Sequence, residues 1–178
     1  MLVNANCSDL CYHRNWPLGN YAKLIKQISI HYPGIKIILL GANEDILQVN
    51  NLVAMVGDGA NIVNLAGKTS IRELLVLIEK TALMISNDSG PAQFTAGYQT
   101  QSIVLFGPET PVLYKPANKK TTVFYKSLYC SPCLNVYHNK GFDFCNENRC
   151  MKEIGVEEVF KCVEERLESI YRKYFATR

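Results

Sequence analysis

A polar cluster, Asn87-Asp88-Ser89-Gly90, interrupts an otherwise apolar part of the chain and is followed by Pro91. Ser89 or Asp88 can cap the start of a helix, and proline is favoured in the first helical turn. The backbone amides at a helix start are open, and the helix dipole attracts negative charge there. The cluster therefore predicts an anion site, with phosphate as the natural ligand. An ordinary capped turn, with Gly90 present only for backbone geometry, would have the same sequence.

Four cysteines are the second set of residues that could do chemistry. Cys130 and Cys133 are separated by two residues, and Cys145 and Cys150 follow in the same polar segment. Two thiolates at this spacing supply half of a tetrahedral zinc site, and a second pair can complete it. A long polar loop would also gain stability from a metal or a crosslink. The pattern leaves two readings open: a structural zinc, with His138 as a spare ligand, or four thiols packed as small apolar side chains.

The elements that must position these groups alternate between strands and helices. Apolar runs predict strands at 2–5, 35–43, 60–67, 82–86, 101–107 and 121–125. Helices are predicted from Pro17 to about 33, at about 44–55, at 70–80 and at about 155–175. Ser70 and Glu73 form the pattern of a capping box at the third of these helices. This alternation predicts an α/β fold with a mainly parallel sheet covered by helices on both faces.

Four loops of this sheet carry small or polar residues where a predicted strand ends. They contain the stretches NANCSD, GAN, SNDSGP and FGPETP. In an open parallel sheet, ligands bind beyond the carboxyl ends of the strands, and small residues let the backbone approach them closely. We therefore expect a ligand site at this edge. Asn6 and Ser8 of the first loop could add amide or hydroxyl contacts to it, or could serve only the turn.

The size and composition of the chain limit its class. With 178 residues, 48% of them hydrophobic and 20% charged, the chain can form one globular domain with a real core, which excludes general disorder. The net charge of +3, with scattered basic residues, does not point to nucleic acid. The apolar runs are too short to cross a bilayer, and the first residues do not resemble a signal peptide. Reduced thiols in a cytoplasm are therefore expected.

Taken in order, these motifs resemble glycosyltransferase family 9, the heptosyltransferase family of lipopolysaccharide core synthesis. NDSGPAQFTA followed by IVLFGPETP resembles the family patterns Asp-Ser/Thr-Gly-x-x-His and Phe/Tyr-Gly-Pro-Thr/Ser. NANCSDLCYHRNWPLGNYAKLI resembles the start of the family's second domain, and NLAGKTSIRELLVLIEKTALMIS resembles its Leu-x-Gly-Lys-Thr-Ser stretch. The CSPC…C…C spacing recurs in many members. The resemblance covers nearly the whole chain.

The resemblance implies a GT-B architecture, in which two Rossmann-like domains face each other across a cleft. Residues 1–178 would form only the second, donor-binding domain, with a Cys-rich loop at 129–151 and a final helix at about 155–175. The acceptor domain, which would hold the general base, has no counterpart in the chain. No catalytic residue is therefore expected here, and this domain alone would be inactive.

The activity implied is inverting sugar transfer. The donor would be a nucleoside diphosphate sugar, with ADP-heptose as the first candidate. The acceptor would be a lipid-linked saccharide of lipopolysaccharide type, bound through the missing domain. No metal would be required for catalysis. The protein would be cytoplasmic, with peripheral association at the inner face of the inner membrane.

The resemblance also implies a set of donor-site residues. They are Asn6, Ser8, Arg14, Lys68, Thr69, Asp88, Ser89, Gly90 and Gln93. Asp88 would accept hydrogen bonds from sugar hydroxyls or hold its loop by capping, and Ser89 and the following amides would bind phosphate. Arg14 would stabilise the leaving diphosphate, unless it is only a solvated charge. Lys68 and Thr69 would lie near the nucleotide, or Lys68 would only flank a helix start.

Two further classes of function stay open. Gln93 stands where the family commonly has His, and glutamine does not titrate near neutral pH. This departure leaves the identity of the donor open and is compatible with a non-catalytic nucleotide- or anion-binding module. The cysteines are compatible with a metal-stapled interaction domain that contacts a protein partner.

Overall fold

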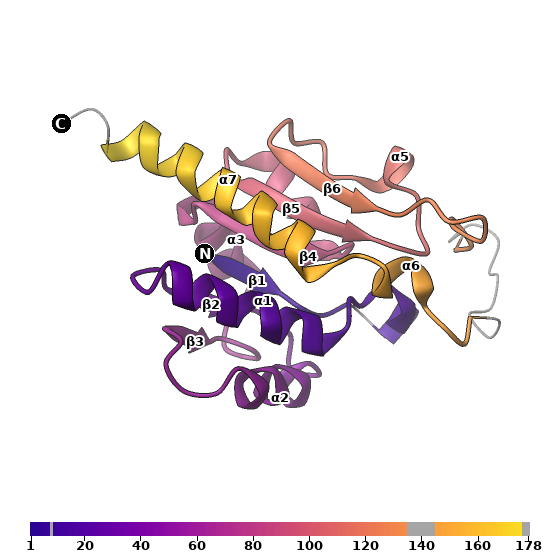
Figure 1. Cartoon of the computed structure of the whole chain (residues 1–178), viewed down its shortest axis with the longest axis horizontal. Helices are drawn as coiled ribbons and strands as arrows, with labels where there is room; N and C mark the ends of the chain where they lie inside the picture. Colours follow the sequence, from indigo (N-terminus) through magenta and orange to yellow (C-terminus); the bar gives the residue numbers. More distant parts are fainter. Residues whose placement is uncertain (8, 135–144, 176–178) are drawn as a thin grey trace.

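The computed structural model describes residues 1–7, 9–134 and 145–175, without the side chains of 9–11 and 173–175. In this part of the chain, six parallel strands form one sheet in the order β3-β2-β1-β4-β5-β6 (Figure 1). They are β1 (Leu2–Asn4), β2 (Ile37–Leu39), β3 (Ile62–Asn64), β4 (Leu83–Asn87), β5 (Gln101–Phe106) and β6 (Thr121–Tyr125). Every predicted strand is present, although β2 and β3 are shorter than the apolar runs that predicted them.

The order of the strands reverses at the centre of the sheet. The chain builds outward from β1 through β2 to β3, returns to place β4 beside β1, and then continues to β5 and β6. The point between β1 and β4 is therefore the topological switch point, where open α/β sheets bind ligands at their carboxyl ends. The loops after β1 and β4, two of the four loops that the sequence placed at the carboxyl edge, flank this point.

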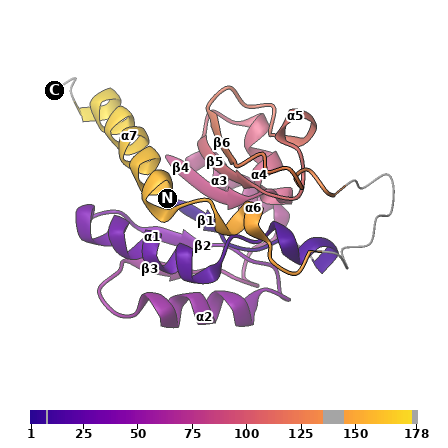
Figure 2. The ribbon, with the colours of Figure 1, turned by 45° about the vertical axis from the view of Figure 1, so that its right-hand side comes forward.

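Helices cover both faces of the sheet (Figure 2). One face carries α1 (Leu18–His31), α2 (Ile46–Val56) and α7 (Val156–Phe175), and the other carries α3 (Ile71–Lys80) and α4 (Gly90–Phe94). The helical spacing of Tyr21, Leu24, Ile25 and Ile28 puts all four on the buried side of α1, as predicted. The capping box of α3 is confirmed, because Ser70 and Glu73 exchange hydrogen bonds.

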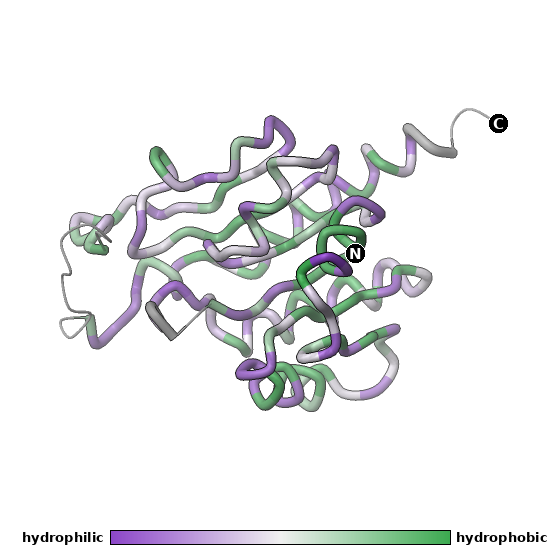
Figure 3. Tube along the Cα trace, turned by 180° about the vertical axis from the view of Figure 1, so that it is seen from behind, coloured by the Kyte–Doolittle hydropathy of each residue, from purple (hydrophilic) through white to green (hydrophobic). Residues whose placement is uncertain are grey.

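Alternate residues of the central strands enter different cores. Ile103 and Leu105 of β5 belong to the apolar cluster formed with α1, α2 and α7. Val104 and Phe106 pack with Ala92 of α4 on the opposite side. The strands are apolar on both faces for this reason, and Figure 3 shows the resulting hydrophobic stretches along them.

Four short helical elements lie in the connections. They are η1 (Asp9–Arg14), η2 (Thr95–Gly97), α5 (Pro111–Tyr114) and α6 (Arg149–Lys152). The sequence predicted none of η1, α5 and α6. One of these, α6, lies at the end of the Cys-rich loop at 129–151. In the described part of the chain, no helix is both long and apolar enough to cross a membrane.

Candidate functional site

Arg14 and Asp88 meet at the switch point of the sheet. Nη1 of Arg14 lies 3.6 Å from Oδ2 of Asp88, and their side chains are 20% and 5% exposed. Within the described residues, Asp88 Oδ2 and Arg14 Nε have no hydrogen-bond partner. Burial raises the pKa of Asp88, and the Arg14 guanidinium opposes that rise. The pair is thus a loose contact with unused hydrogen-bonding capacity, which a polar ligand can take up.

Asn87 holds the two halves of this site together. Its Oδ1 accepts hydrogen bonds from the backbone amide of Trp16 at 3.1 Å and from the hydroxyl of Tyr21 at 2.9 Å. Its Nδ2 donates to Oδ1 of Asn15 at 3.2 Å. Asn87 is fully buried and ends β4, so the strand that leads to Asp88 also fixes the loop that carries Arg14. The sequence placed Asn87 in the polar cluster but gave it no role.

Ser89 is held from inside the sheet. Asn4 Nδ2 donates to Ser89 Oγ at 3.0 Å, and the hydroxyls of Ser86 and Ser89 are 3.0 Å apart. Ser89 occupies the N-cap position of α4 and Pro91 lies in its first turn, as predicted, but the predicted cap hydrogen bond from the Ser89 side chain is absent. Gly90 is exposed, and a side chain there would meet nothing within 4 Å.

Asn6 lies on the other side of the switch point and is tied to β2. Its Nδ2 donates to the carbonyl of Leu40 at 3.0 Å, and within the described residues its buried Oδ1 has no hydrogen-bond partner. Gly41 allows this approach, because a Cβ at that position would lie 3.1 Å from Nδ2 of Asn6 and 2.9 Å from Cβ of Asp45. Ser8, the other predicted residue of this loop, lies outside the described residues.

Three predicted site residues lie apart from the Arg14–Asp88 pair. Lys68 and Thr69 follow β3, which is separated from β1 by β2, and Lys68 Nζ donates to the carbonyl of Asn64 at 3.2 Å. Gln93 is exposed and donates through Nε2 to the carbonyl of Tyr114 at 2.6 Å. The described contacts therefore join Arg14 to Asp88, while Asn6, Lys68 and Gln93 bond to backbone carbonyls of other loops.

Glu109 is a site residue that the sequence reasoning missed. It follows β5, is only 3% exposed, and accepts a hydrogen bond from the backbone amide of Thr110 at 3.2 Å. Burial raises the pKa of Glu109; the Thr110 bond lowers it, nearby Asp88 raises it, and Arg14 lowers it. Glu109 stands where the family pattern has Thr or Ser after Phe/Tyr-Gly-Pro. This departure from the pattern could have identified Glu109 as a candidate site residue.

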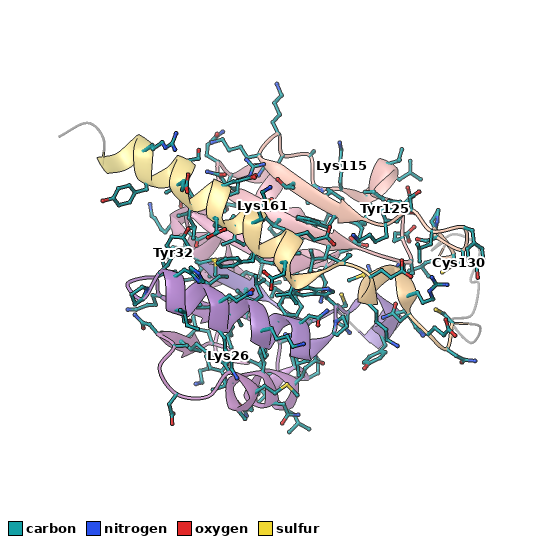
Figure 4. The ribbon with its side chains drawn as sticks, in the orientation of Figure 1. Lys26, Tyr32, Lys115, Tyr125, Cys130 and Lys161 are labelled. Atoms are coloured by element: carbon teal, nitrogen blue, oxygen red, sulfur yellow. The ribbon has the colours of Figure 1, made fainter. Side chains whose placement is uncertain are left out.

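Cys130 of the Cys-rich loop lies beyond the carboxyl end of β6 (Figure 4). Cys150 is buried, and burial together with the nearby Cys133, Cys145 and Cys130 raises the pKa of its thiol to about 11. In the described part of the chain, no group of three or more His, Cys, Asp or Glu side chains is arranged to hold a metal ion. His138 lies outside the described residues. The arrangement thus does not fit a metal site as it stands, and the structural zinc stays a prediction.

The Cys-rich loop is hydrogen-bonded to two loops of the site. The backbone amides of residues 133–134 donate to the carbonyl of Pro108 at 3.0 and 2.9 Å, next to Glu109. Nε2 of His13 donates to the carbonyl of Cys145 at 2.8 Å, next to Arg14. The Cys-rich loop therefore contacts both the loop after β5 and the η1 turn after β1.

A pocket of about 480 Å³ opens behind the η1 turn. Its walls come from η1, the starts of α1 and α2, and the residues around α6, including Tyr12, Asn15, Gln48, Asn51 and Lys152. None of the predicted donor-site residues lines it, although His13 and Asn15, on either side of Arg14 in the chain, do.

Comparison with known proteins identifies the family. Residues 2–141 match the family model described as glycosyltransferase family 9 (heptosyltransferase). The chain belongs to glycosyltransferase family 9. Among curated relatives of this family 9 chain, lipooligosaccharide heptosyltransferase 2 of Campylobacter jejuni serotype O:2 is 27% identical over 155 residues, which cover 83% of this chain and 45% of that protein.

Solved structures show the same fold. The Escherichia coli ADP-heptose lipopolysaccharide heptosyltransferase II matches with a TM-score of 0.76 and 20% sequence identity. The match covers 94% of the family 9 chain and 46% of the E. coli protein. An E. coli heptosyltransferase solved with ADP matches with a TM-score of 0.69 and 19% sequence identity. That match covers 93% of the family 9 chain and 43% of the E. coli protein. The family 9 chain thus spans less than half the length of these proteins. Its Rossmann-like fold, expected from the resemblance, is confirmed.

Proposed function

We propose that this family 9 chain is the donor-binding half of an inverting glycosyltransferase. The donor is a nucleoside diphosphate sugar, with ADP-heptose as the first candidate, and the acceptor is a lipid-linked saccharide of lipopolysaccharide type. The observation that carries the proposal is the Arg14–Asp88 pair at the switch point, which joins a cation and a carboxylate with free hydrogen-bonding atoms.

In this proposal Arg14 and Asp88 bind different parts of the donor. The planar guanidinium of Arg14 has five N–H donors and suits two phosphate oxygens at once. The carboxylate of Asp88 only accepts hydrogen bonds and therefore suits sugar hydroxyls. Lys68 and Thr69 follow the outer strand β3, and in this proposal they bind the nucleoside end of the donor.

Transfer proceeds by attack of an acceptor oxygen on the anomeric carbon. The bond from this carbon to the phosphate oxygen breaks, and the diphosphate leaves with the bonding electrons. Arg14 stabilises the negative charge that develops on the diphosphate, which lowers the barrier. The acceptor proton passes to a base that we place in the other domain. The three relatives described above are heptosyltransferases, which supports this class of reaction.

Calorimetric titration of the chain with ADP, UDP and GDP tests the nucleotide site. We expect the tightest binding for ADP. Arg14→Gln should weaken it by about 10- to 100-fold, because hydrogen bonds between charged groups contribute about 1.5–3 kcal/mol. Arg172→Gln is the matched control, since Arg172 is 80% exposed and lies near the end of α7 far from the site (Figure 1).

Two results would overturn the proposal. One is the absence of binding by all three nucleotides at millimolar concentration. The other is an Arg14→Gln variant that binds ADP as tightly as the wild-type chain. Catalytic turnover by the chain alone would contradict the assignment of the base to another domain.

A further inference from the structure

Glu109 is a buried acid that the proposed donor site does not yet use. It is 3% exposed at the carboxyl end of β5 and accepts one hydrogen bond, from the amide of Thr110. Among the described residues, Glu109 is in none of the ion pairs. Buried carboxylates are costly without a partner, so the position of Glu109 calls for an explanation.

The order of the strands places Glu109 beside the Arg14–Asp88 pair. Arg14 follows β1, Asp88 follows β4 and Glu109 follows β5, and these three strands are neighbours in that order. Arg14 contacts Asp88, and the adjacent strands β4 and β5 lie about 4.8 Å apart, so we place Glu109 on the β5 side of Asp88, in a row along the carboxyl edge. Asp88 and Arg14 both act electrostatically on Glu109, which agrees with this proximity.

The charges in this row do not balance. Two carboxylates share one guanidinium, and Asp88, with a side chain only 5% exposed, has an oxygen without a hydrogen-bond partner among the described residues. Carboxylate oxygens only accept hydrogen bonds. The ligand at the β4–β5 end of the row must therefore bring hydrogen-bond donors and no negative charge.

We propose that Glu109 determines which sugar the donor carries: with Asp88 it accepts hydrogen bonds from the hydroxyls of a neutral sugar, and it repels a sugar that carries a carboxylate. The inference rests on the proposed function, because it requires the diphosphate at Arg14. An anionic diphosphate is attracted to the cationic end of the row and the sugar then extends toward β5, where Glu109 lies. An acidic sugar would place a third carboxylate next to two others in a poorly solvated site.

Three probes that share one nucleotide test this selectivity. They are ADP, ADP-glucose and ADP-glucuronic acid, of which the last two differ in the charge of the sugar. Dissociation constants are measured by calorimetry on the 178-residue chain. The variants are Glu109→Gln, which removes the charge at constant size, and Glu109→Asp, which keeps it. Glu79→Gln is the control, because Glu79 is an exposed acid on α3.

The wild-type chain and Glu79→Gln should bind ADP-glucose at least about tenfold more tightly than ADP-glucuronic acid. Glu109→Gln should reduce this ratio to about twofold or less, and Glu109→Asp should retain most of it. Glu79→Gln should bind ADP as tightly as the wild-type chain, both Glu109 variants should still bind ADP measurably, and circular dichroism should confirm that all four proteins fold. If Glu109→Gln does not fold, Glu109→Thr, which introduces a residue of the family pattern, makes the same comparison.

An unchanged ratio in folded Glu109→Gln, with ADP binding intact, would overturn this inference and leave the proposed function standing. Equal affinity of the wild-type chain for the two sugar nucleotides would do the same. Failure of the wild-type chain to bind ADP would instead remove the proposed function, and this inference with it.

Discussion

The side-chain oxygen of Asn87 accepts a hydrogen bond from the backbone amide of Trp16 at 3.1 Å. This bond joins the last residue of β4 to the loop that carries Arg14, and Asp88 is the next residue after Asn87. The cation and the carboxylate of the site are thus held at their separation by a neighbouring amide. Asn87 is a positioning residue, and it acts on a ligand only through the loop.

Asn87→Ala should destabilise the chain by about 2–4 kcal/mol, because it leaves the buried amide of Trp16 and hydroxyl of Tyr21 without their acceptor. Urea denaturation measures this change. Asn50→Ala is the control, since Asn50 is exposed and accepts one hydrogen bond from Asn64, and it should cost at most about 0.5 kcal/mol. Equal stability of the two variants would contradict the role of Asn87.

The contribution of Asp88 and Glu109 to the stability of the chain should fall as the pH rises from about 4 toward neutrality. Burial raises the pKa values of Asp88 and Glu109, so between the unfolded-state and folded-state pKa values the folded chain binds more protons. The contribution of these two carboxyl groups to the free energy of unfolding is therefore fully present below the unfolded-state pKa. It is lost as the pH rises through the folded-state pKa. Glu109→Gln should gain stability relative to the wild type at neutral pH and lose that advantage in acid. Urea denaturation at several pH values measures the difference, and a pH-independent difference would contradict it.

Gly107→Ala should destabilise the chain by about 1–3 kcal/mol through overpacking. A Cβ at this position would lie 3.0 Å from Sγ of Cys150 and would also clash with the buried side chain of Met151. Thermal denaturation measures the loss. Gly97→Ala serves as the control, because a Cβ there would meet nothing within 4 Å. Comparable melting temperatures for both variants would argue against tight packing between the loop after β5 and α6.

Ser70→Ala should cost about 1 kcal/mol, since it removes the side chain that caps α3 next to Lys68 and Thr69. Ser29→Ala, which removes a hydroxyl bonded within α1 to the carbonyl of Ile25, should change stability by at most about 0.5 kcal/mol. Urea denaturation compares the two. A Ser70 variant as stable as the Ser29 variant would show that the cap is dispensable.

The sheet and its main helices were predictable because their signals are local. Apolar runs predicted every strand, and the spacing from Tyr21 to Ile28 predicted the buried face of α1. Elements of four to six residues, such as α6 and η1, are too short to show a helical period, so no pattern of apolar residues predicted them.

The site was harder to predict because its contacts join distant parts of the chain. The role of Arg14 came from the family resemblance, and only the fold brings it to Asp88. The expected cap hydrogen bond of Ser89 is absent because Asn4 and Ser86 bind the hydroxyl from a neighbouring strand and from β4 itself. Glu109 was missed because its burial depends on the same kind of non-local packing.

The Cys-rich loop bonds to both flanks of Asp88, through the backbone carbonyl of Pro108 and through the side chain of His13 in the η1 turn. A shift of this loop would displace Arg14 and Glu109 in concert, and so alter the two ends of the charged row together. Mutational surveys of this protein should therefore score substitutions at residues 131–134 alongside ligand-contacting positions, as remote determinants of donor affinity.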